Sequence, residues 1–119
     1  MRTIIAGSRN TQMAVHKVFK AIEHCGFPVT EIVSGCGGNV DHAGEYVADV
    51  KHLTLHRFPA DWVKYGRKGG PMRNRQMAEY ADALIAIWDG KSKGTKNMID
   101  EAKKRGLSVY VEGDNDALG

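Results

Sequence analysis

The chain has 119 residues, of which 42% are hydrophobic and 26% charged, as is typical of a single globular domain. Its net charge of +3 favours anionic ligands but is too small for a dedicated nucleic-acid-binding protein. No apolar run approaches the roughly 20 residues that span a bilayer, and the N-terminus has no apolar leader, which excludes a membrane protein. Cys25 and Cys36 indicate reduced thiols and the histidines lack ligand spacing, so we expect a soluble cytoplasmic protein without a metal site.

Hydrophobic periodicity predicts strands that alternate with helices along the chain. Strands are expected at residues 3–6, 31–34, 53–58, 83–88 and 108–111, and helices at 11–24, 41–51, from Pro71 to about 81 and from about Thr95 to Gly106. Segment 83–88 is apolar without alternation, as in a parallel strand buried on both faces. The pattern predicts an α/β, Rossmann-like three-layer sandwich with a mostly parallel sheet of about five strands. We expect one domain over residues 1–112, a polar connection at 59–70 and a C-terminal tail at 113–119.

Glycine-bearing loops follow three of the predicted strands. The candidate ligand-binding residues in these loops are Gly7, Ser8 and Arg9, then Gly35, Gly37, Gly38 and Asp41, and finally Asp89, Gly90, Ser92, Gly94 and Thr95. In an open parallel sheet, a ligand binds outside the carboxyl ends of the strands, where the strand order reverses. We therefore predict that these loops converge on one anionic ligand.

The loop after Trp88 is the candidate phosphate cradle, because a strand-to-helix turn can offer backbone N–H groups to an anion. This interpretation requires the amides that follow Trp88 to be unpaired. The alternative is an ordinary turn in which Thr95 lies near the helix N-cap. The loop is not a P-loop, since the Gly-Lys-Ser/Thr ending is absent.

Candidates in the first two loops also have structural explanations. Ser8 would donate to a ligand and Arg9 would contact phosphate, or both would lie in a plain surface turn. Asp41 would accept hydrogen bonds from ribose hydroxyls, or would cap the predicted helix. Glu45, four residues later on the same helical face, is expected to be solvated or structural.

Arg73, Asn74 and Arg75 lie near the start of the helix predicted from Pro71. Two arginines at the positive end of a helix dipole are unfavourable for the helix alone, whereas a bound anion would reverse that effect. Asn74 falls on the apolar stripe of the helix and must find partners if it is buried. Trp62 is either a local core residue or a surface on which a base stacks.

Several short motifs together resemble the SLOG superfamily, which is named for the DNA-processing protein A and LONELY GUY groups, and in particular its small YspA-like, cpYpsA-related branch. The motifs are residues 4–9, Ser34-Gly35 with Asp41 and Gly44-Glu45, residues 58–62, residues 70–74, and residues 88–90 with Gly94-Thr95. The resemblance covers nearly the whole chain. It implies a Rossmann-like fold, binding of nucleotides or of ligands similar to ADP-ribose and NAD, and self-association as a homodimer or larger homo-oligomer.

LONELY GUY enzymes cleave nucleoside monophosphates at the N-glycosidic bond, and this chain departs from their motifs. Met72 and Arg75 match the first motif, but Met98 stands where the resemblance would place the catalytic glutamate. If the protein is an enzyme, N-glycosidic hydrolysis is the expected reaction. Its oxocarbenium-like transition state needs a nearby carboxylate, for which Asp89 and Asp41 are the candidates.

The sequence therefore predicts a protein that binds a nucleotide-like small molecule, as a sensor, a sequestering protein or an N-glycosidic hydrolase, with no resident cofactor. The alternative is a single-stranded nucleic-acid-binding protein of the DNA-processing type. In that case, Trp62 and Tyr65 would stack on bases. The basic residues that would contact the strand are Lys64, Arg67, Lys68, Arg73, Arg75, Lys91, Lys93 and Lys96.

Overall fold

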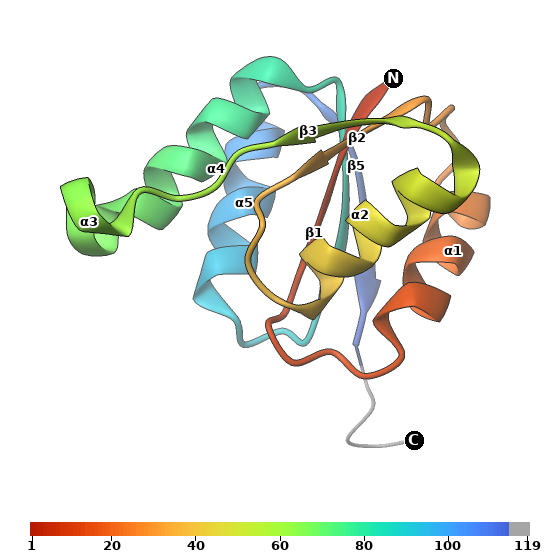
Figure 1. Ribbon diagram of the computed structural model, residues 1–119, viewed down its shortest axis with the longest axis horizontal. Coiled ribbons are helices and arrows are strands. Elements are labelled where there is room, and N and C mark those ends of the chain that lie inside the picture. The colour runs from red at the N-terminus through yellow and green to blue at the C-terminus, as the bar shows by residue number, and fades with distance from the viewer. Residues whose placement is uncertain (115–119) are drawn as a thin grey trace.

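A computed structural model describes residues 1–114 and shows one parallel sheet in that range, with the strand order β3-β2-β1-β4-β5 (Figure 1). The strands are β1 (Arg2–Gly7), β2 (Glu31–Ser34), β3 (Thr54–Arg57), β4 (Ala83–Trp88) and β5 (Ser108–Gly113). The helices are α1 (Ala14–His24), α2 (Asn39–Lys51), α3 (Trp62–Tyr65), α4 (Gly69–Tyr80) and α5 (Lys93–Lys104), with a 3-10 turn, η1 (Gly66–Lys68), between α3 and α4. The predicted α/β Rossmann-like fold is confirmed.

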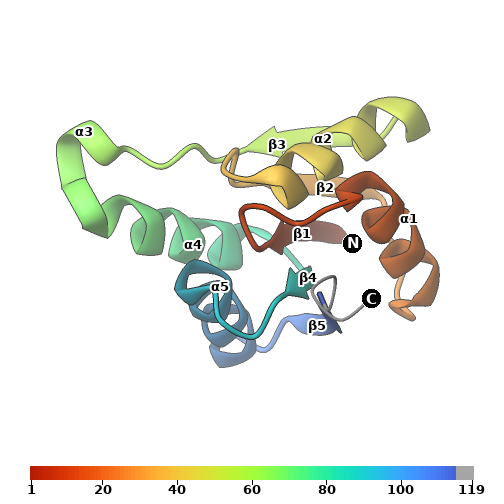
Figure 2. The same ribbon diagram turned by 90° about the horizontal axis from the view of Figure 1, so that it is seen from below.

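Helices cover both faces of the sheet, so the molecule has three layers (Figure 2). Ile5 points to the layer of α1 and α2, where it packs in one cluster with Val18 and Val47. Its neighbour Ile4 points to the opposite layer and packs with buried residues of α4 and α5. This alternation follows from the two-residue period of a strand, and it explains why both residues of a central strand must be apolar.

Strand β4 lies at the centre of the sheet with β1, and its residues from Ala83 to Ile87 are all buried. The two strands pair in register from Thr3 opposite Ala83 to Gly7 opposite Ile87. From β1, the chain winds in one direction to β2 and β3, whereas β4 and β5 lie on the other side. The strand order therefore reverses between β1 and β4, which is the place where doubly wound sheets bind ligands.

The connection predicted at 59–70 contains structure that the hydrophobic pattern did not indicate. Asp61 caps the four-residue helix α3 by accepting a hydrogen bond from the backbone N–H of Lys64 (2.9 Å). The segment Trp62–Lys68, here called the arm, lies at the start of α4 and away from the sheet, and all of its residues are exposed (Figure 2). A periodicity argument needs several turns and a buried face, and the arm has neither.

Element ends differ from the prediction by a few residues. Helix α4 begins at Gly69, directly after η1, so Pro71 is its third residue instead of its first. Strand β5 continues to Gly113 instead of ending at 111, and the Asp114 N–H donates to the Trp88 carbonyl (2.7 Å). The tail predicted to start at 113 thus has its first residue in the sheet, and its residues 115–119 lie outside the described part. Among residues 1–114, no helix is long and apolar enough to cross a membrane.

Candidate functional site

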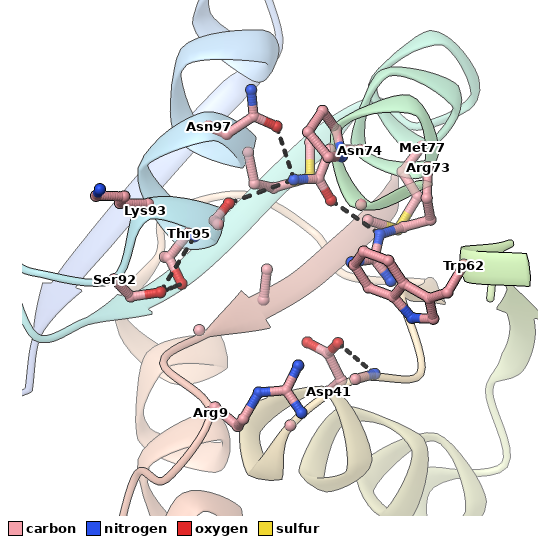
Figure 3. A pocket seen from close by; sticks show the side chains of 18 residues that line it. Arg9, Asp41, Trp62, Arg73, Asn74, Met77, Ser92, Lys93, Thr95 and Asn97 are labelled. Carbon is pink, nitrogen blue, oxygen red and sulfur yellow. Dashed lines mark hydrogen bonds between the residues drawn. The ribbon is translucent and has the colours of Figure 1, made fainter. Parts of the chain in front are cut away.

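A cavity of about 340 Å³ lies at the carboxyl ends of β1 and β4, where the strand order reverses (Figure 3). The predicted site residues that line it are Gly7, Arg9, Gly37, Gly38, Asp41, Trp62, Arg73, Asn74, Ser92, Gly94 and Thr95. The predicted residues that lie outside its lining are Ser8, Gly35, Arg75, Asp89 and Gly90. The lining also includes residues that we had not assigned to the site, namely Ala6, Gly70, Pro71, Met77, Lys93, Asn97 and Met98.

The loop after β1 is held in place by close backbone contacts and by Ser8. A Cβ on Gly7 would lie 2.5 Å from the Ile87 carbonyl oxygen and 2.6 Å from Val40 Cγ2, so only glycine fits there. Ser8 is 5% exposed, and its hydroxyl accepts a hydrogen bond from the Asp89 amide (3.1 Å). Ser8 therefore joins the loops after β1 and β4, instead of facing the cavity as predicted.

Gly38 allows the same loop to lie against the start of α2. A Cβ on Gly38 would be 2.5 Å from the Cα of Arg9, and the Asn39 amide donates to the Arg9 carbonyl (2.9 Å). This contact fixes the backbone of Arg9, whose exposed side chain reaches the cavity (Figure 3). Glu45 has the structural role that we expected, since its carboxylate accepts a hydrogen bond from Ser34 Oγ (2.8 Å).

Asp41 lies in the first turn of α2 and is only 8% exposed. One of its carboxylate oxygens accepts a hydrogen bond from the Gly37 amide (2.8 Å). Burial raises the pKa of the Asp41 carboxyl, and the Gly37 hydrogen bond and the Arg73 guanidinium only partly oppose this shift. Burial therefore disfavours the ionised form of Asp41 relative to the neutral acid. A charged group kept in such a place lowers the stability of the fold, which is common at functional sites.

Replacing Asp41 with Asn should increase the free energy of unfolding at neutral pH. A buried acid whose folded-state pKa is raised costs stability above that pKa, and the cost fades as the pH falls through it towards the ordinary value near 4. The advantage of Asp41→Asn should therefore be largest at pH 7 and should shrink at pH 4, as measured by urea denaturation. Asp100→Asn, at an exposed position, is the control. A variant less stable than the wild type at pH 7 would contradict the burial argument.

Arg73 and Asn74 tie α4 to the loops on either side of the cavity. The Arg73 guanidinium donates from Nη1 to the Gly35 carbonyl and from Nε to Asn74 Oδ1 (2.9 Å). Asn74, 5% exposed, donates from Nδ2 to Asn97 Oδ1 (2.8 Å) and to the Gly94 carbonyl (3.3 Å). The expectation that a buried Asn74 must find partners is thus met inside the protein. Arg75 is exposed and does not line the cavity, so Arg73 is the arginine of α4 that lines the site.

Most of the amides after Trp88 are already paired, which corrects the predicted cradle. The amides of Lys91 and Ser92 both donate to Asp89 Oδ1 (2.8 Å each), and these bonds lower the pKa of the Asp89 carboxyl. The Thr95 amide donates to Ser92 Oγ (3.4 Å), so the N-cap of α5 is Ser92 and not Thr95. Asp89 holds its own loop together and lies outside the cavity.

Two amides at the start of α5 remain open. Within residues 1–114, the N–H groups of Lys93 and Gly94 have no hydrogen-bond partner, and both residues line the cavity. Arg73 Nη2 also has no hydrogen-bond partner in that range. The first turn of a twelve-residue helix carries partial positive charge, so the two amides form a smaller anion site than the sequence predicted. Arg73 adds a cation to the cavity on the side where Trp62 lies (Figure 3).

Among the described residues, Asp41 is the one carboxylate that lines the cavity. Met98, 1% exposed, also lines it, at the position where the family resemblance would place a glutamate. No cluster of three potential metal-ligating side chains occurs within residues 1–114. The cavity therefore combines three cationic side chains (Arg9, Arg73 and Lys93) and two open amides with one buried carboxyl group.

No protein-family model matches the chain. The gene 61 protein of Mycobacterium phage D29 is 43% identical over 61 residues, which are 50% of this chain and 47% of that protein. The crystal structure of DNA processing protein A (DprA) from Streptococcus pneumoniae superposes with a TM-score of 0.74 at 18% identity, covering 92% of this chain and 49% of that one.

The chain thus has a DprA-like Rossmannoid fold, and it spans about half the length of both proteins. At 18% identity, the likeness to DprA concerns the fold alone. The predicted resemblance is confirmed at that level, while its YspA-like branch stays a prediction.

Proposed function

We propose that the protein binds a nucleotide or a nucleotide-derived ligand through its phosphate, at the cavity between β1 and β4. The observation that carries this proposal is the set of open donors there: the Lys93 and Gly94 amides at the start of α5 and Nη2 of Arg73. The charges of Lys93, Arg9 and Arg73 outnumber that of Asp41, so the cavity favours an anion. Its volume of about 340 Å³ is within the range of small-molecule sites.

Binding, and not N-glycosidic hydrolysis, is the function proposed. Retaining and inverting glycosidases both use a pair of carboxyl groups that flank the bond to be broken. Here, Asp89 is engaged by its own loop, and Asp41 is the carboxyl group that supports a contact to the ligand, with a ribose hydroxyl as the expected donor.

A thermal-denaturation screen tests the proposal. The probes are mononucleotides, cyclic nucleotides, NAD, ADP-ribose and a short oligonucleotide. A ligand present at 100 times its Kd should stabilise the fold by about 2.7 kcal/mol and raise Tm by roughly 10 °C. The proposal fails if none of these probes shifts Tm.

Two lysines of α5 provide matched variants for the same screen. Lys93 lines the cavity, whereas Lys96 lies outside it and pairs with Asp100 (2.9 Å). Lys93→Ala should lose most of the ligand-induced shift and Lys96→Ala should keep it. Equal shifts in both variants would place the ligand elsewhere.

A second candidate, single-stranded nucleic-acid binding, is supported by the arm. Lys64, Arg67 and Lys68 are exposed there beside the cavity, and the name of the solved structure with the same fold refers to DNA processing. Contacts between these side chains and phosphates would make the affinity fall steeply with salt, with each contact contributing about −0.7 to the slope of log K against log salt for a single strand. Oligonucleotide affinity that is insensitive to salt and to an Arg67→Ala/Lys68→Ala double change would exclude this candidate.

A further inference from the structure

Trp62 closes one side of the cavity from outside the sheet. It is the first residue of α3, which projects from the body of the molecule, and it is 53% exposed. Its indole nevertheless turns back to line the cavity (Figure 3). An exposed tryptophan that lines a site, and not the core, is available to contact a ligand.

Two glycines at the start of α4 determine how close the indole lies. A Cβ on Gly70 would be 2.9 Å from Trp62 Cη2, and one on Gly69 would be 3.4 Å from Trp62 Cε3. The ring therefore rests against the backbone of the helix, where a larger residue would push it outward. Within the described residues, the indole has no hydrogen bond, ring contact or cation over its face. Its exposed surface is not engaged by the protein itself.

The cavity has two chemically different ends. Trp62 lies opposite Ser92 and Lys93, across the cavity (Figure 3). Pro71 and Met77 also line the cavity and add apolar surface from α4, where the Arg73 guanidinium lies beside Trp62, whereas the two open amides lie on α5 (Figure 3). A ligand that satisfies both ends carries an aromatic ring and a phosphate, joined by a spacer such as a sugar.

We propose that Trp62 is the stacking surface for a nucleobase, so that the site selects base-bearing phosphates over sugar phosphates and bare phosphates. This inference rests on the proposed function and adds the part of the ligand that gives specificity. The same base could belong to a free nucleotide or to a nucleotide within a strand, because stacking on an aromatic side chain uses only the face of the base. If Trp62 were instead a passive wall, its loss would weaken every ligand of the cavity alike.

Isothermal titration calorimetry with the full chain separates these cases. The probes are adenosine 5′-monophosphate and ribose 5-phosphate, which differ by the base, and a 5′-phosphorylated trinucleotide with its abasic counterpart. Trp62→Ala should weaken binding of adenosine monophosphate at least about 5-fold, the lower end of the range for a base–aromatic stack, and binding of ribose 5-phosphate less than about 2-fold. Trp62→Phe should retain most of the affinity because it preserves an aromatic face.

Val63 offers a matched control, since it is the next residue of α3, is fully exposed and does not line the cavity. Val63→Ala should bind all probes as the wild type does. Quenching of tryptophan fluorescence by adenosine monophosphate should occur in the wild type and disappear in Trp62→Ala. A base effect in the trinucleotide pair but not in the mononucleotide pair would assign the stacked base to a strand.

Equal loss with and without the base in Trp62→Ala, in the mononucleotide pair and in the trinucleotide pair alike, would overturn the stacking role. Wild-type binding that is equally tight with and without the base in both pairs would also overturn it. Either result would leave the phosphate site itself standing. Absence of binding by every phosphate probe to the wild type would overturn the proposed function together with this inference.

Discussion

Gly7→Ala should destabilise the protein by about 3 kcal/mol or more, because the site has no room for an added methyl group. The added carbon would meet the Ile87 carbonyl oxygen at 2.5 Å and the side chain of Val40 at 2.6 Å. Ile87 belongs to the central strand and cannot move without disturbing its pairing with β1. Urea denaturation monitored by circular dichroism measures the change directly.

Gly94→Ala is the matched control for this substitution. A Cβ on Gly94 has no atom within 4 Å, and the residue lies in the first turn of α5. Alanine should be tolerated there and should add up to about 1 kcal/mol through its higher helix propensity. A free energy of unfolding of Gly7→Ala within about 1 kcal/mol of that of Gly94→Ala would contradict a close approach of β1, β4 and α2 at Gly7. A Gly7→Ala chain recovered only in the insoluble fraction, beside soluble Gly94→Ala, would support it.

Arg73→Ala should reduce affinity for a phosphate-bearing ligand about 100-fold. Burial lowers the pKa of the Arg73 guanidinium, because the charge has lost part of its hydration, and the nearby Asp41 carboxylate opposes that shift. Removing a buried, hydrogen-bonded charge from a binding site costs about 2–5 kcal/mol in general. The variant should also be less stable, since Gly35 and Asn74 each lose a donor.

Arg75→Ala is the control for Arg73, because it removes the same charge two residues away, at an exposed position outside the cavity. It should leave ligand affinity within about 2-fold, measured by calorimetry with the ligand found in the thermal screen. Arg73→Lys should recover only part of the affinity, since a lysine has no planar fork of donors. An Arg75→Ala variant as impaired as Arg73→Ala would show that long-range charge, and not contact, attracts the ligand.

The fold could be predicted because its central strands carry an unambiguous pattern. Segment 83–88 is apolar throughout, and only a strand covered on both faces needs that composition. The arm could not be predicted, since α3 has only four residues and none of them is buried. What holds α3 in place is the Asp61 cap and the close contact of Trp62 with Gly70, and neither leaves a periodic pattern in the sequence. The ends of α4 and α5 were misplaced because capping depends on backbone geometry at single residues, which a periodic pattern does not reveal.

The site could be predicted in outline and not in detail. Strand ends of a parallel sheet meet at one edge, so loops with Gly7, Gly38 and Gly94 had to come together. The sequence could not predict which amides stay open. The side chains of Asp89 and Ser92 accept hydrogen bonds from backbone amides of the same loop, as short polar side chains often do. The choice between Arg73 and Arg75 depended on the exact rotation of α4. The ligand-binding roles themselves stay predictions.

The strand order also has a consequence for synthesis of the protein. Strand β1 pairs with β2 on one side and with β4, some 80 positions later, on the other. A nascent chain that has left the ribosome only as far as α3 therefore exposes one bare edge of an apolar strand, a template for aggregation. Premature termination in that interval should yield material that depends on chaperones, and a chain competent to bind a ligand should emerge only after α5 has been translated.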